Sequence, residues 1–236
     1  MSGYTRKDLK KDKFAEEVKH GYEFLTEHRG QAKLYGGIAA IVIAIGAGSY
    51  FYIHYQAEVR EEKLAEAIRI DGAAFGPTPT QPGTLHYATI EEKEQARAKA
   101  FGELVTKYRG SQEGAIAAFY LASDVADKGD MAGAEKRYKD ILDSAPVEYA
   151  SMARMSLAKI YETEGKTADA EKLLRYAMDH PTISVSKERA TIQLALLIGK
   201  TNPDAARKLL EPLRTSRTPV SRAAVQALGD IQNVGK

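Results

Sequence analysis

Residues 115–146 read AIAAFYLASDVADKGDMAGAEKRYKDILDSAP, and this stretch decides the fold. Apolar residues recur at helical spacing on both sides of Gly129, which predicts two helices joined by a short turn. Small residues such as Ala122 and Ala134 fall where the two helices of such a hairpin touch, because larger side chains would hold the helices apart. A glycine in the turn can adopt a positive φ that ends the first helix. Pro146 then closes the unit.

The same pattern returns further along the chain. The small residues Ala122, Ala158, Ala195 and Gly229 stand 36, 37 and 34 residues apart. A single hairpin of this kind cannot bury its apolar side, so successive hairpins are expected to stack into a right-handed superhelix. An unrelated helical bundle with accidental periodicity is the alternative, and three units in register argue against it. The expected repeats, within residues 111–236, cover 115–148, 151–184, 188–219 and a partial unit at 222–236.

These units resemble the tetratricopeptide repeat. In the first unit the matching residues are Leu121, Ala122, Gly129, Asp130, Ala134, Tyr138, Ile141 and Pro146. In the second they are Leu157, Ala158, Tyr161, Gly165, Lys166, Ala170, Leu174 and Ala177. The third unit matches more loosely, and its second helix is expected to start at Pro203, since proline is tolerated in a first turn. The resemblance implies an all-α fold whose first helices line a concave face.

The repeat register places seven residues on that concave face, which predicts a protein-binding groove. They are Phe119, Ser123, Met152, Met155, Lys159, Arg189 and Ile192. Exposed Phe and Met suit adaptable binding of extended or helical protein segments. The alternative is that some of them pack under the loop 76–89 or under the next helix. The Lys/Asn set with which some tetratricopeptide domains clamp a C-terminal carboxylate is not at these positions, which disfavours a chaperone-tail receptor of that kind.

Residues 56–110 are expected to form a linker helix and a divergent first hairpin. The loop 76–89 interrupts this region, because it holds three prolines and two glycines. Thr89 then starts a helix, with Glu92 three residues later as a capping box.

Leu34 to Tyr55 is a run of 22 residues without Lys, Arg, Asp or Glu. As a helix it is long enough to cross a bilayer, and aromatic residues at its ends suit the membrane interface. The alternatives are a buried helix of a soluble core and a cleaved signal peptide; the long leader and the aromatics that follow Ser49 favour an uncleaved anchor. Small residues recur every four positions and predict a face for packing against another transmembrane helix or a second copy: Gly36, Ala40, Ala44 and Gly48.

The tail, residues 1–33, contains a predicted amphipathic helix with the stripe Phe14, Val18, Tyr22 and Leu25. This stripe could lie on the membrane, dock on a partner or merely space the chain from the bilayer. The basic residues from Arg6 to Lys13 favour a cytoplasmic tail, although the counts next to the span are balanced. The large domain is then expected on the opposite side, which in a bacterium is the periplasm.

Composition excludes several classes of function. The chain has 34 basic and 32 acidic residues, and its large domain is balanced, so nucleic acid is not an expected partner. The absence of Cys removes disulfides and thiolate metal sites. The five His residues are scattered, and neither an HExxH motif nor a phosphate-binding loop occurs. We therefore expect no catalytic residues, no cofactor and no metal, and predict that the protein is not an enzyme.

The whole layout resembles the YfgM-like ancillary subunit of the Sec translocon, within the membrane-anchored tetratricopeptide repeat proteins. The resemblance implies a bacterial inner-membrane protein with a single span, associated with the SecYEG channel and with periplasmic chaperones in handling secreted proteins. The alternative is an envelope-assembly or cell-division scaffold that binds cell-wall or outer-membrane machinery.

Overall fold

The computed structural model describes residues 17–19, 29–78, 83–216 and 218–234. The chain divides into two compact units, Met1–Glu58 and Val59–Lys236. The described residues form helices with two very short strands, which confirms the predicted all-α class. The elements are α2 (Arg29–Asp71), β1 (Ala74–Phe75), β2 (His86–Tyr87), α3 (Ile90–Lys107), α4 (Gln112–Asp127), α5 (Met131–Ser144), α6 (Val147–Thr163), α7 (Thr167–Asp179), α8 (Lys187–Gly199), α9 (Pro203–Arg214) and α10 (Val220–Val234).

In the first unit the apolar run 34–55 is helical as part of α2. Among the described residues, α2 is the one helix that is long and apolar enough to cross a membrane, judged by length and composition. Its apolar side chains are exposed, with Ile43 at 70% and Phe51 at 71%, so the run is not buried in a core of this chain. Of the predicted tail stripe only Val18 lies within the described residues.

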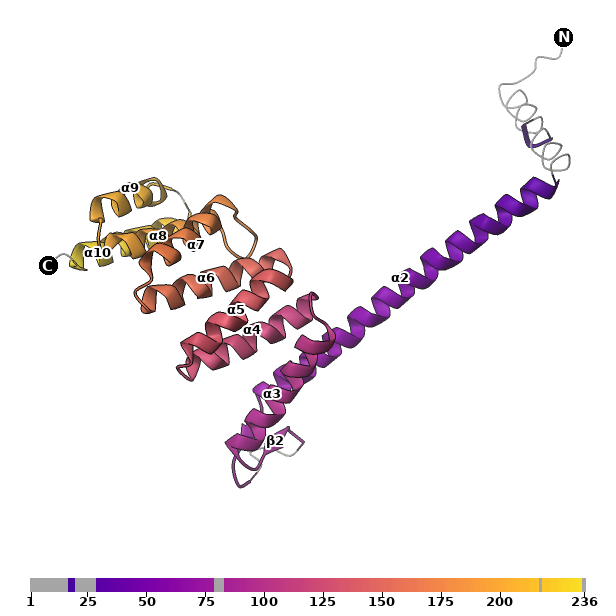
Figure 1. Cartoon of the computed structure of the whole chain (residues 1–236), viewed down its shortest axis with the longest axis horizontal. Coiled ribbons are helices and arrows are strands. Elements are labelled where there is room, and N and C mark those ends of the chain that lie inside the picture. The colour runs from indigo at the N-terminus through magenta and orange to yellow at the C-terminus, as the bar shows by residue number, and fades with distance from the viewer. Residues whose placement is uncertain (1–16, 20–28, 79–82, 217, 235–236) are drawn as a thin grey trace, which may run out of the picture. The chain divides into compact units, whose positions relative to one another are not determined.

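In the second unit each helix packs against the next one, and Figure 1 shows α3 to α10 as a stack of antiparallel hairpins. The small residues of the repeat register lie at the helix contacts, as predicted: Ala122, Ala134 and Ala195 are fully buried. Large apolar residues fill the space between hairpins, with Leu157 joining α6 to the core of the preceding hairpin. The tetratricopeptide-type arrangement is therefore present in the structure.

Two pairs of first helices also contact each other, α4 with α6 and α8 with α10, whereas α6 and α8 make no comparable contact within the described residues. No two second helices, α3, α5, α7 and α9, make comparable contact within the described part of the chain. This difference places the first helices on the more tightly packed side of the stack.

The turns follow the sequence signals. Gly129 and Gly165 have φ of +85° and +75°, the conformation that glycine adopts without strain. The Asp130 side chain accepts a hydrogen bond from the Gly133 N–H at 2.8 Å and so caps α5. The helix α9 begins at Pro203, as predicted, and the Asn202 side chain caps it by accepting from the Ala205 N–H at 3.0 Å.

The first hairpin consists of the C-terminal part of α2 and the helix α3. Phe101 and Leu104 of α3 pack with Ala67 of α2 and Ala117 of α4 in one buried cluster. Arg97 of α3 completes the connection: its Nη1 donates to Asp71 of α2 at 2.9 Å, and its Nη2 pairs with Asp124 of α4.

The loop between α2 and α3 is closed by a small parallel ladder that the sequence did not predict. Ala74 pairs with His86, and Phe75 pairs with Tyr87. The helix α2 ends at Asp71, before the extended residues Ala74 and Phe75 that form this ladder. At the other end of the loop the predicted N-cap of α3 is confirmed, because Thr89 Oγ1 accepts from the Glu92 N–H at 3.2 Å. The second bond of the predicted capping box differs: the Glu92 carboxylate accepts from the Ala88 N–H at 3.1 Å and not from the Thr89 N–H.

Candidate protein-binding surface

The predicted groove begins on α4, where Phe119 and Ser123 face the second helix of the same hairpin. Ser123 Oγ lies 3.0 Å from the Tyr138 hydroxyl oxygen. The Phe119 ring meets the Tyr138 ring edge to face at 5.3 Å between centroids. A pocket of about 310 Å³ adjoins the two α4 residues and is also lined by Asp71, Arg97, Tyr120, Asp124 and Asp127. This end of the predicted surface is therefore hollow and has both aromatic and acidic walls.

The two predicted methionines on α6 are half-buried. Met152 and Met155 pack against a cluster of Ala177, Val185 and Ala190, which belongs to α7, the α7–α8 loop and α8. The following hairpin thus covers part of their surface. This agrees with the alternative that some of the predicted groove residues pack under the next helix. Both methionines nevertheless remain partly exposed.

The next predicted residues lie on α6 and α8. Ile192 is half-buried against the core to which helices α6 to α10 contribute. Arg189 is exposed, and its backbone N–H donates to Ser186 Oγ at 3.2 Å at the start of α8. Lys159 is exposed and its Nζ lies 2.9 Å from Glu162 Oε2.

Glu162 links two hairpins, because its other oxygen lies 2.8 Å from the Nζ of Lys200 at the end of α8. Burial opposes the ionisation of this carboxyl, but the hydrogen bonds from Lys200 and Lys159 outweigh burial and hold the pKa of Glu162 below its ordinary value. Lys159 is therefore engaged with an anion at neutral pH, and a ligand that used it would have to compete with Glu162.

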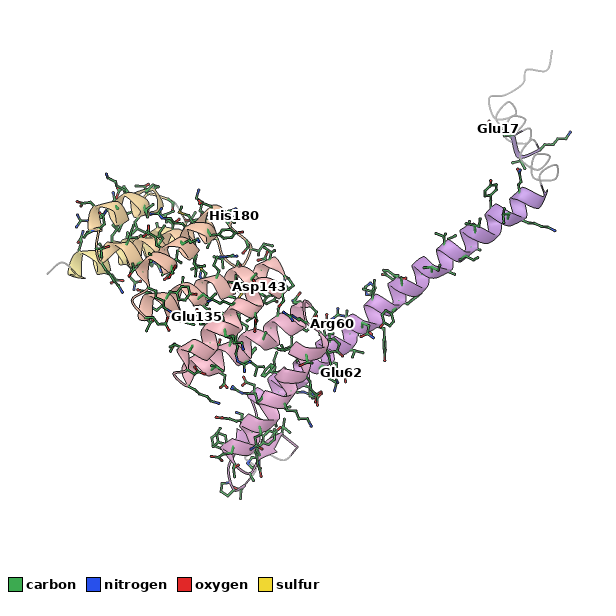
Figure 2. All side chains as sticks on the ribbon, viewed as in Figure 1. Glu17, Arg60, Glu62, Glu135, Asp143 and His180 are labelled. Carbon is green, nitrogen blue, oxygen red and sulfur yellow. The ribbon has the colours of Figure 1, made fainter. Side chains whose placement is uncertain are left out.

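A second charged link joins α5 to α6. Glu135, labelled in Figure 2, lies on α5. It accepts hydrogen bonds from Lys139 Nζ at 2.6 Å and from the Tyr161 hydroxyl at 3.0 Å. These bonds, Lys139 first and Tyr161 second, lower the pKa of the Glu135 carboxyl. Both links connect consecutive hairpins, so they help to fix the spacing of the first helices that carry the candidate surface.

The predicted transmembrane packing face lies on α2. Its four residues, Gly36, Ala40, Ala44 and Gly48, share one side of the helix and are exposed. A Cβ atom added at Gly36 or Gly48 would meet nothing within 4 Å. Within the described residues nothing covers this face, and its role stays a prediction.

Sequence reasoning missed a groove on the other side of the stack, between α3 and α5. It has a volume of about 380 Å³, and its floor is the N-terminal half of α4. The small residues Gly114, Ala115 and Ala118 of α4 lie along it. Their spacing was visible in the sequence, but the gap depends on how far apart two non-consecutive helices lie.

Within the part of the chain that the structure describes, no group of three or more His, Asp or Glu side chains is placed to hold a metal ion. Taken together, the stacked hairpins and the surfaces between them define the class of helical-repeat proteins, whose extended surfaces bind other proteins.

The chain belongs to the tetratricopeptide repeat-like domain family, whose model matches residues 28–179. Comparisons with curated proteins and with solved structures gave no match. Domains of this family are typically non-catalytic scaffolds for protein–protein interaction.

Proposed function

We propose that this protein is a membrane-anchored scaffold that binds segments of partner proteins on the face formed by α4, α6 and α8. The observation that carries the proposal is the pocket beside Phe119 and Ser123, which residues of α2, α3 and α4 line. The pocket offers the aromatic surface of Phe119 and Tyr120, and its carboxylate outside the Asp71–Arg97–Asp124 ion pairs is Asp127. The repeat register places the partly exposed Met152 and Met155 on the same face. Flexible thioethers and rings suit the binding of peptide segments of varied sequence.

Anchoring is supported by the exposed apolar run 34–55 of α2. A continuous exposed apolar surface of this length is unfavourable in water, and a bilayer would cover it. The basic residues of the tail favour a cytoplasmic N-terminus, so the repeat domain is proposed to lie in the periplasm of a bacterial cell.

The finer part of the proposal is association with the Sec translocon and with periplasmic chaperones in handling secreted proteins. Its support is the resemblance in layout: a charged tail, one anchoring helix and a small repeat domain. The face of Gly36, Ala40, Ala44 and Gly48 is proposed to hold the span against the translocon.

Site-specific photocrosslinking in living cells tests the binding face. A photoreactive residue is placed at Phe119 or Met155, and as a control at the exposed Lys172 on the second helix α7. We expect protein adducts from the first two positions that are absent from the third. Equal adducts from all three positions would contradict binding on this face.

The same method tests the translocon. Crosslinks from Gly36 or Ala44 to translocon subunits are expected, and recovery of only a second copy of the chain would refute this assignment. Crosslinks from Phe119 to cell-wall or outer-membrane machinery would favour the envelope-assembly alternative instead.

Topology has a direct test, because the chain has no cysteine and a single introduced one is unique. A membrane-impermeant maleimide applied to intact cells should label Lys172→Cys and leave Ser2→Cys unlabelled. The reverse pattern would place the repeat domain in the cytoplasm.

A further inference from the structure

The groove between α3 and α5 is apolar at its floor. Ala115 and Ala118 of α4 and Ile141 of α5 line this part of the groove, and Ala115 and Ile141 are buried. The alanines leave the space open, since their side chains are too short to fill it. A volume of about 380 Å³ lies at the lower end of the range for ligand pockets and admits one or two side chains of a partner.

Two arginines of the groove have no ion pair within the described residues, as is also true of Arg69 and Arg222 elsewhere in the domain. Arg109, in the turn after α3, and Arg137, on α5, both line it and are exposed. Arg60, Arg97 and Arg175 each pair with a carboxylate, whereas Arg109 and Arg137 have no ion pair or hydrogen bond within the described residues.

The groove therefore has a surplus of positive charge. Asp140 is the acidic residue of the lining, against the two arginines, so the lining carries one net positive charge. Guanidinium groups bind carboxylates through paired, directional hydrogen bonds. Two arginines alone are far fewer than a nucleic-acid site uses, and the large domain has no net basic excess.

We propose that this groove is a second binding site, specific for a partner segment in which an aliphatic or aromatic residue stands next to Asp or Glu. The apolar side chain enters over Ala115 and Ala118, and the carboxylate meets Arg109 and Arg137. The inference rests on the proposed function only in that the domain binds protein segments. It concerns the side of the second helices α3 and α5, whereas the proposed function concerns the face formed by α4, α6 and α8.

The test is a selection from a displayed library of random 12-residue peptides on the full-length protein in detergent. We expect the selected peptides to combine a large apolar residue with Asp or Glu. Changing Arg109→Gln or Arg137→Gln should weaken their binding about tenfold or more each, because a hydrogen bond to a charged group is lost. Added salt should weaken binding as well.

Two further variants separate the groove from general effects. Ala118→Phe fills the space and should abolish binding, while Ala168→Phe, at an exposed site on α7, should not. Lys172→Gln removes a positive charge elsewhere on the exposed surface and should leave the affinity unchanged. Circular dichroism of each variant checks that the helices remain.

Several outcomes would overturn the proposal: selected peptides without carboxylates, binding that survives both Ala118→Phe and the arginine variants, or a selection that yields no groove-dependent peptide. Arginine-dependent binding to anionic phospholipid vesicles in place of peptides would overturn it too. None of these results touches the crosslinks expected from Phe119, so failure of the groove and failure of the proposed function remain distinguishable.

Discussion

Replacing Gly114 by alanine should destabilise the domain, although alanine is the better helix former. Gly114 lies in the first turn of α4, where a Cβ atom would stand 2.2 Å from the carbonyl oxygen of Tyr108 and 2.9 Å from its carbonyl carbon. Both atoms are backbone, so they cannot rotate away. Relief requires the turn between α3 and α4 to open by roughly 1 Å or more.

The cost follows from the bonds in that turn. The Ser111 N–H donates to Tyr108 O at 3.0 Å, and Ser111 Oγ accepts from the Gly114 N–H at 3.0 Å. Losing the turn bond and the cap costs about 1 kcal/mol each. The better helix propensity of alanine offsets about 1 kcal/mol of this. A net loss of about 1 kcal/mol in the free energy of unfolding is expected.

Gly102 of α3 supplies the matched control. It is also inside a helix, but an added Cβ would meet nothing within 4 Å. Gly102→Ala should therefore raise stability by about 0.5–1 kcal/mol. The two variants should differ by about 2 kcal/mol in urea titrations of the full-length protein in detergent, followed by circular dichroism. If Gly114→Ala is as stable as Gly102→Ala, the close approach to Tyr108 does not constrain the turn.

Three other predictions concern stability. Leu194→Ala, at a fully buried core position, should lower the free energy of unfolding by about 2–5 kcal/mol, whereas Val225→Ala, at a site that is 54% exposed, should change it little in the same urea titration. Gly129→Ala, at a φ of +85°, should cost about 1–2 kcal/mol, and a variant as stable as wild type would show that the turn relaxes freely. Burial opposes ionisation of Glu113, but hydrogen bonds from its own backbone N–H and from Arg60 lower the pKa of this carboxyl, so its contribution to the free energy of unfolding is present above the unfolded pKa of about 4.3 and is lost as the pH falls through the lower folded value. Glu113→Gln should therefore reduce the loss of stability in acid. An unchanged dependence of the free energy of unfolding on pH would contradict this.

The hairpins could be predicted because they depend on local signals that repeat. Small residues such as Ala122 and Ala158 mark the helix contact, and Gly129 and Gly165 mark the turns. Each signal acts within one unit of the repeat. In the third unit, which matches the repeat most loosely, the start of the second helix at Pro203 could still be predicted, because proline is favoured in the first turn of a helix.

The surfaces were less predictable, because they depend on residues that are distant in the sequence. Met152 and Met155 are partly covered by Val185, which is 1% exposed and lies in the loop between α7 and α8. The sequence does not show that this loop folds back. The pairing of Arg60 with Glu113, 53 residues apart, and the groove between α3 and α5 depend likewise on the spacing of helices in the stack.

The unequal contacts on the two sides of the stack have a mechanical consequence. Among the described residues, α4 contacts α6 and α8 contacts α10, whereas neither α6 and α8 nor any two second helices make comparable contact. Bending of the stack at these two places would therefore change the spacing of the second helices more than the spacing of the first helices. A ligand held by both Arg109, in the turn after α3, and Arg137, on α5, would fix the spacing of these two second helices, and with it the bend between the first hairpin and the second.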